Sequence, residues 1–187
     1  MRNTKLKRIV PLVLLLALVG SAFQTLKSAQ AADTSNQAPD LPAICSSIQV
    51  EAGNSVSRQA FATGVQIYRW DGTAWVFVEP AAGLFADANY HGKIGIHYRG
   101  PTWESNSGSI VVAARVLGTG CIPDPNSIAW LLLKKVSTDG PGIFSNVAFI
   151  QRVNTTGGMP PTNAGTTVGE LAEVPYTAEY YFYRASN

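Results

Sequence analysis

The sequence predicts an all-β fold, a single-domain antiparallel sandwich or barrel with one long Gly/Thr/Pro-rich loop. Three observations indicate this class. After the first 31 residues, no amphipathic helical pattern of ordinary length occurs. Short apolar runs alternate instead with turn residues at spacings typical of all-β domains. The segment 155–169 is crowded with Gly, Thr and Pro and nearly lacks large apolar side chains, which is typical of a long surface loop.

The apolar runs give the expected strands in chain order. They are residues 65–70, 74–78, 93–98, 109–117, 128–136, 143–153 and 176–184. Asp71 and Gly72 separate the first two and favour a tight hairpin, because both residues tolerate positive φ. The turn residues 106–108 predict a second hairpin before the fourth run. A one-turn helix is expected at 81–86.

Two of these runs need a closer argument. Trp130–Leu133 is a continuous apolar block, which fits either a strand buried on both faces or a short core helix, and we favour the strand. The last run alternates, so that its side chains fall on two faces of a closing strand. One face carries Tyr176, Ala178, Tyr180 and Phe182, and the other carries Thr177, Glu179, Tyr181 and Tyr183.

Residues 1–31 have the three parts of a cleaved secretory signal peptide. A basic start precedes an apolar run at 9–19, and Ala29-Gln30-Ala31 forms a small-x-small cleavage site. The apolar run is shorter than the roughly 20 residues that a bilayer crossing needs. We expect an exported protein, periplasmic or secreted, with a signal peptide at 1–31, a flexible lead-in at 32–43 and a single β domain at 44–187. No membrane span is expected after signal cleavage.

The charge pattern argues against nucleic acid as a partner. The chain has 14 basic and 12 acidic residues, and residues 1–31 hold five of the basic ones and no acidic one, so the remainder has a net charge of −3. No basic cluster remains to contact phosphates. Gly118-Thr119-Gly120 lacks the third glycine and the helix of a dinucleotide site. The two histidines, His91 and His97, match no metal motif. We therefore expect neither cofactor nor metal.

Two cysteines, Cys45 and Cys121, lie in the expected mature chain. An oxidising compartment permits a disulfide between them. Two separate buried thiols are the alternative.

The segment 97–104 is the main candidate for a ligand site. Its His97, Arg99, Trp103 and Glu104 combine an imidazole, a guanidinium, an indole and a carboxylate around a Gly-Pro break. An indole can stack on a polar ligand while charged groups form hydrogen bonds to it. The alternative, which we favour, is a core tryptophan beside a structural Arg–Glu pair on a strand end.

Arg152 joins the candidates because it ends an expected strand just before the long loop. A guanidinium there can bind a ligand carboxylate or phosphate, or form a structural salt bridge to Glu179, and we favour the salt bridge. No catalytic residue is assigned, because the sequence has no Gly-x-Ser-x-Gly elbow and nothing in it pairs two carboxylates.

An ordered set of short motifs resembles an exported family catalogued as domain of unknown function 3455. The motifs are GVQIY at 64–68, GPTWE at 100–104, WLLL at 130–133, FIQR at 149–152, Gly157-Gly158 and VPYTAEYYF at 174–182. The resemblance implies no established activity and no site residues. Fungal members often carry the label malate dehydrogenase, which this chain does not support, because it has no nucleotide-binding βαβ unit.

The chain also departs from that family pattern. Cysteines tend to follow the QIY and Gly-Gly motifs in the family, whereas this chain has Arg69-Trp70 and Asn163-Ala164-Gly165 there. The bridge that the family implies is therefore absent, and Cys45 with Cys121 is its candidate local substitute.

Together these observations favour a non-enzymatic exported β domain that binds a small molecule or a cell-envelope component. The expected site lies at the end of the sandwich or barrel near 97–104 and Arg152, and it requires His97, Arg99, Glu104 and Arg152 to share one cleft. A small hydrolase with His97 and Glu104 as acid and base is one alternative, and it requires those two side chains within hydrogen-bond reach. A structural or interaction protein without a pocket is the other.

Overall fold

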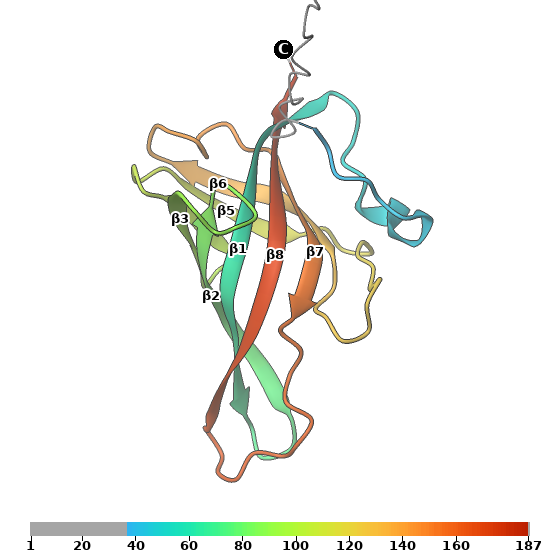
Figure 1. Ribbon diagram of the computed structural model, residues 1–187, viewed down its shortest axis with the longest axis vertical. Helices are drawn as coiled ribbons and strands as arrows, with labels where there is room; N and C mark the ends of the chain where they lie inside the picture. The colour runs from blue at the N-terminus through green and yellow to red at the C-terminus, as the bar shows by residue number, and fades with distance from the viewer. Residues whose placement is uncertain (1–36, 187) are drawn as a thin grey trace, which may run out of the picture. The chain divides into compact units, whose positions relative to one another are not determined.

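Eight antiparallel strands close into one barrel in the computed structural model, which describes residues 37–186 (Figure 1). The strands are β1 (Asn54–Trp70), β2 (Trp75–Phe85), β3 (Lys93–Tyr98), β4 (Thr102–Ser105), β5 (Ile110–Arg115), β6 (Leu131–Asp139), β7 (Phe149–Gly157) and β8 (Leu171–Ala185). Each strand pairs with the next in sequence, and β1 also pairs with β8. The all-β class is confirmed, as a barrel. The expected signal peptide and the first residues of the lead-in lie outside the described range.

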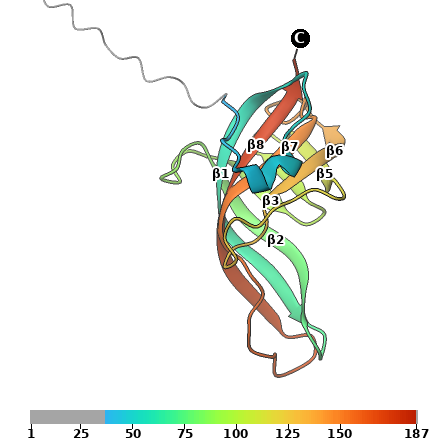
Figure 2. The ribbon, with the colours of Figure 1, turned by 90° about the vertical axis from the view of Figure 1, so that its right-hand side faces the viewer.

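Strand alternation produces two apolar clusters, one on each face of the sheet. On β8, Tyr180 and Phe182 point into the barrel, whereas Tyr181 and Tyr183 point outward, as the alternation predicts. The outer cluster is covered by a short 3-10 helix, η2 (Ala43–Ile48), which lies beside the sheet in Figure 2. The outer face of this part of the sheet is therefore buried as well.

A disulfide joins Cys45 of η2 to Cys121 in the β5–β6 connection. Cys45 and Ile48 are fully buried and pack with Leu132 and Phe149, whose side chains lie on the outer face. The expected bridge is confirmed. It ties the segment before β1 to a loop 76 residues away in sequence.

The two ends of the barrel differ in how they are filled. At the end with the β6–β7 connection, Phe144 is fully buried and its ring centroid lies 4.7 Å from that of Phe182. Apolar side chains therefore close this end. The opposite end carries the β1–β2, β3–β4, β5–β6 and β7–β8 connections, and the described part of the chain has no comparable plug there.

The expected β1–β2 hairpin is confirmed, with Trp70 paired to Trp75. Its turn is longer than the dipeptide suggested, because Asp71 N donates to Ala74 O and the Asp71 carboxylate accepts hydrogen bonds from Thr73 N and Ala74 N. Those backbone donors lower the pKa of Asp71. The left-handed φ of 101° at Gly72 completes the turn.

Two local expectations are wrong and one ambiguity is resolved. Residues 81–85 continue β2 and form no helical turn, because they pair with β1 along the long ladder. Residues 143–148 form the connection that closes the barrel, and β7 begins only at Phe149. The Trp130–Leu133 block leads into β6 and is not a helix. The described residues contain no helix with the length and hydropathy that crossing a membrane requires.

Candidate ligand-binding cavity

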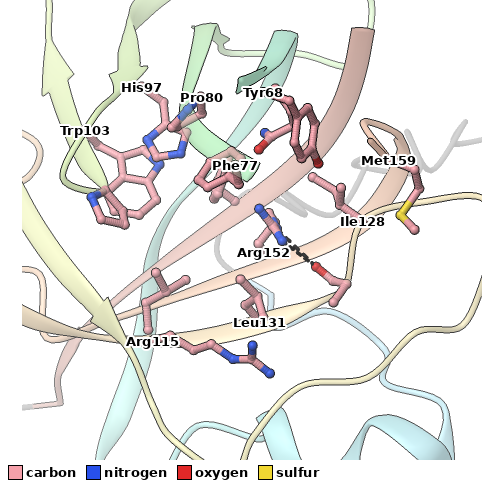
Figure 3. Close-up of a pocket in the computed structure, with 15 residues that line it drawn as sticks. Tyr68, Phe77, Pro80, His97, Trp103, Arg115, Ile128, Leu131, Arg152 and Met159 are labelled. Carbon is pink, nitrogen blue, oxygen red and sulfur yellow. Dashed lines mark hydrogen bonds between the residues drawn. The ribbon is translucent and has the colours of Figure 1, made fainter. Parts of the chain in front are cut away.

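A cavity of about 340 Å³ occupies the open end of the barrel (Figure 3). Its size is at the lower end of the range for small-molecule pockets. All eight strands and three of the connections at this end contribute to the wall. The lining residues are Gln66, Tyr68, Phe77, Pro80, His97, Pro101, Trp103, Arg115, Ile128, Ala129, Leu131, Leu133, Arg152, Met159 and Tyr180. Aromatic and aliphatic side chains predominate, and no carboxylate is among them.

An aromatic cluster of His97, Trp103 and Tyr180 forms the inner wall. His97 and Trp103 are cross-strand partners on β3 and β4, and their rings stack. Tyr180 of β8 meets both rings edge-on, with centroids 5.3 and 5.5 Å away. All three residues are almost fully buried, so the wall is closely packed.

His97 is neutral in this environment. Burial lowers its pKa to about 3, outweighing the opposing effect of its hydrogen bond with the Thr102 carbonyl. That carbonyl lies 2.8 Å from Nδ1 and can only accept, so the proton of the neutral ring is on Nδ1. Nε2 is then a hydrogen-bond acceptor on the same wall.

Arg152 brings the only positive charge into the interior among the described lining residues, because Arg115 lies exposed at the rim. Its Nε and Nη2 atoms donate to the carbonyl of Ala129, at 3.1 and 2.8 Å (Figure 3). The expected pairing with Glu179 is wrong, since Glu179 lies on the outer face and accepts hydrogen bonds from Gln59 and Asn154.

Several buried polar atoms around the cavity have no hydrogen-bond partner among the described residues. They are Gln66 Nε2, Trp103 Nε1, Tyr180 Oη and, four residues earlier on β8, Tyr176 Oη. Buried polar groups in folded proteins are normally paired, with protein or with another molecule. Tyr176 lies close enough to Tyr180 and Gln66, and Tyr180 close enough to Arg152, for these groups to shift the pKa values of the two tyrosines. Water or another small polar molecule can complete the bonding of this group of side chains.

The rim of the cavity is fixed by Tyr68 and Phe77. The Tyr68 hydroxyl donates to the Gly158 carbonyl at 2.6 Å, which attaches the β7–β8 connection to β1. The ring of Phe77 meets Tyr68 edge-on at 5.7 Å and is half exposed. Met159, next to the anchored Gly158, is also exposed at this rim.

The structure brings three of the five predicted ligand residues together and separates the other two. His97, Trp103 and Arg152 line the cavity. Arg99 pairs with Glu79 at 2.9 Å outside it, and Glu104 accepts a hydrogen bond from the Tyr98 hydroxyl. Strand alternation explains the division, because Glu104 follows the inward-facing Trp103 and must face outward.

This geometry does not assemble the acid–base pair of the hydrolase alternative. His97 is inside the barrel, and Glu104, one position along the opposite strand, is outside it. Within residues 37–186, no three His, Cys, Asp or Glu side chains gather as metal ligands. His91 pairs with Asp87 in the β2–β3 turn, and neither residue lines the cavity.

A model of the family described as "Protein of unknown function (DUF3455)" matches residues 51–184, which include all of the cavity residues. The chain belongs to the DUF3455 family. Cys45 lies before the matched segment of this DUF3455 chain. No curated protein and no solved structure matches the chain.

Sequence reasoning missed several residues of the DUF3455 cavity, chiefly Gln66, Tyr68, Phe77 and Tyr180. Gln66 and Tyr68 alternate on β1 within GVQIY, and a polar residue on the buried face of a strand was the available indication. No pattern in the sequence indicated Phe77, because its position at the rim depends on how far β2 extends past the neighbouring strands.

Proposed function

We propose that this DUF3455 domain binds a small, largely apolar molecule in the open end of its barrel, and that it does so as an exported protein. The observation that carries the proposal is the coincidence of a cavity with unpaired buried polar atoms on its wall. An apolar pocket with a few convergent polar groups is the usual form of a small-molecule site. The Cys45–Cys121 disulfide supports export, because such bridges persist in oxidising compartments.

Binding is favoured over catalysis because the cavity contains no nucleophile–base or acid–base pair. Its one histidine is neutral and hydrogen-bonded to a backbone carbonyl. Its aromatic walls instead offer area for packing and stacking.

Thermal unfolding in the presence of a ligand panel tests the proposal. The panel contains small carboxylic acids, sugars and neutral aromatic compounds, and a compound that binds the folded state raises Tm. Leu131→Trp places a bulky side chain in the cavity, and Val136→Trp adds the same side chain to the exposed outer part of the same strand. We expect at least one compound to raise Tm of the wild type and of Val136→Trp, but not of Leu131→Trp. No shift with any compound, or an equal shift in all three proteins, overturns the proposal.

A further inference from the structure

We infer that the cavity selects a singly charged carboxylate with a flat apolar body, whose carboxyl group is held by Arg152. The inference rests on the proposed function, since it assumes that the cavity binds a small molecule. It specifies the charge and shape of the ligand and names Arg152 as the residue that discriminates between ligands.

The first argument is the unused bonding capacity of Arg152. A guanidinium has five N–H donors, and here Nε and Nη2 share a single acceptor, the Ala129 carbonyl. The two salt bridges found in the described part of the chain are His91–Asp87 and Arg99–Glu79, so neither involves Arg152. The guanidinium is thus held in place by a neutral group and retains donors for a second partner.

The second argument is the uncompensated charge. Burial raises the pKa values of Tyr68, Tyr176 and Tyr180, and the charge of Arg152 offsets part of each rise. The positive potential of Arg152 therefore reaches several walls of the barrel. No lining residue is acidic, and His97 is neutral, so one unbalanced positive charge remains inside. An anion with a single charge neutralises it.

The third argument distinguishes a carboxylate from a phosphate. Arginine binds either group through two parallel hydrogen bonds. A phosphate monoester carries almost two negative charges at neutral pH, and the second cation, Arg115, lies exposed at the rim with Nη2 bonded to the Thr119 carbonyl. The interior charge matches a carboxylate, and the unpaired Tyr180 hydroxyl can donate a further hydrogen bond to it.

The fourth argument concerns the rest of the ligand. Phe77, Ile128 and Leu131 lie around Arg152 and give it apolar surroundings, and Trp103 adds an indole on the inner wall (Figure 3). Leu133 also lines the cavity. Such walls bury an aromatic or short aliphatic body and offer few bonds to a hydroxyl-rich one. A sugar acid fits them less well than an aromatic acid.

Titration calorimetry with three matched probes tests the assignment. The probes are 2-naphthoate, its neutral amide 2-naphthamide, and 2-naphthyl phosphate, each added to the wild type, Arg152→Gln, Arg152→Lys and Arg99→Gln. Arg99→Gln is the control, since it removes an equal charge outside the cavity. We expect the wild type and the control to bind 2-naphthoate at least about tenfold more tightly than 2-naphthamide, a factor within reach of hydrogen bonds to a charged group.

The variants of Arg152 provide the decisive comparison. Arg152→Gln is expected to lose the preference for 2-naphthoate while still binding 2-naphthamide, and Arg152→Lys to keep part of it. Equal binding of the two probes by the wild type, an unchanged preference in Arg152→Gln, or tighter binding of the phosphate overturns the carboxylate assignment and leaves the proposed function standing. Failure of all three probes to bind the wild type also overturns the carboxylate assignment, whereas the proposed function fails only if no compound of the thermal-unfolding panel binds. Circular dichroism verifies that each variant is folded.

Discussion

The imidazole of His97 lies parallel to the indole of Trp103, with ring centroids 4.2 Å apart and 12° between the ring planes. The two residues face each other across the β3–β4 ladder, which brings their side chains to the same side of the sheet. Stacking on the indole and the edge contact of Tyr180 exclude water from the imidazole. A charge on His97 is therefore unfavourable in the folded protein.

The free energy of unfolding is expected to decrease as the pH falls below about 6.5. The pKa of His97 is about 3 in the folded protein, whereas its ordinary value is 6.5. Between these values the unfolded chain binds a proton that the folded chain does not, so protonation favours unfolding as the pH falls. The slope from this residue approaches about 1.4 kcal/mol per pH unit. Urea denaturation at pH 7, 6 and 5 measures it.

Two variants isolate the contribution of His97 to this slope. His97→Gln removes the titrating ring and is expected to flatten the dependence of stability on pH between 7 and 5, although it lowers stability at pH 7. His91→Gln makes the same substitution at the other histidine, which is exposed, and serves as the control. Equal slopes in the wild type and His97→Gln contradict the prediction.

Much of the fold follows from local patterns, and the element boundaries do not. The alternation in 176–184 correctly gives the inward and outward faces of β8, and Asp71-Gly72 correctly marks a hairpin. By contrast, β1 begins well before the expected run, at Asn54, because pairing with β8 holds the polar residues of its first half in the strand. Closure into a barrel depends on these long-range pairings, which no short window of sequence contains.

The candidate site was predictable at those residues whose chemistry suits a ligand and whose place in the strand alternation directs them into the barrel. His97, Trp103 and Arg152 are polar or amphipathic residues on inward positions, and they meet in the cavity. Arg99 and Glu104 looked equally suitable in sequence, but their outward positions separate them from it. Proximity along the chain is a poor guide to a strand site, because neighbouring residues face opposite sides.

Gln151 connects the barrel wall to the helix that covers it. It is fully buried, its Nε2 donates to the Ile48 carbonyl at 2.7 Å, and its Oε1 accepts a hydrogen bond from the Tyr183 hydroxyl. Gln151→Leu leaves both partners buried without a hydrogen bond, and each such group costs about 1–3 kcal/mol. We expect the free energy of unfolding to fall by about 2–4 kcal/mol in urea denaturation.

A double-mutant cycle separates this bonding from lost packing. Tyr183→Phe removes one of the two partners, so Gln151→Leu is expected to cost less in that background than in the wild type. If the losses of unfolding free energy in the two single variants simply add in the double variant, the hydrogen-bond explanation is contradicted. Side-chain packing then accounts for the loss in Gln151→Leu.

The Cys45–Cys121 disulfide is expected to contribute about 4 kcal/mol of stability, since it restricts the unfolded chain over a separation of 76 residues. The double variant Cys45→Ala, Cys121→Ala removes it without leaving a free thiol. Urea denaturation of that variant and of the wild type gives the difference. A loss below about 1 kcal/mol contradicts the chain-entropy explanation.

Gly64 of β1, two residues before Gln66 of the cavity, pairs with Ala82 of β2. A Cβ at this position lies 2.2 Å from the Ala81 carbonyl oxygen and 2.5 Å from the Ala82 Cα, both of which are backbone atoms. Gly64→Ala therefore has to move one strand, and overpacking of this kind costs about 1–3 kcal/mol. Because the shift also displaces Gln66, we expect weaker ligand binding together with a lower Tm.

Gly83→Ala is the matched control for Gly64→Ala, because Gly83 lies on the same ladder, opposite Thr63. A Cβ there first meets the ring of Phe85, at 2.8 Å, and a side-chain ring can rotate away where a backbone cannot. Gly83→Ala is therefore expected to lower Tm less than Gly64→Ala and to leave ligand binding unchanged. Equal losses of Tm in the two variants contradict the backbone-contact explanation and indicate that the ladder tolerates no Cβ at either position.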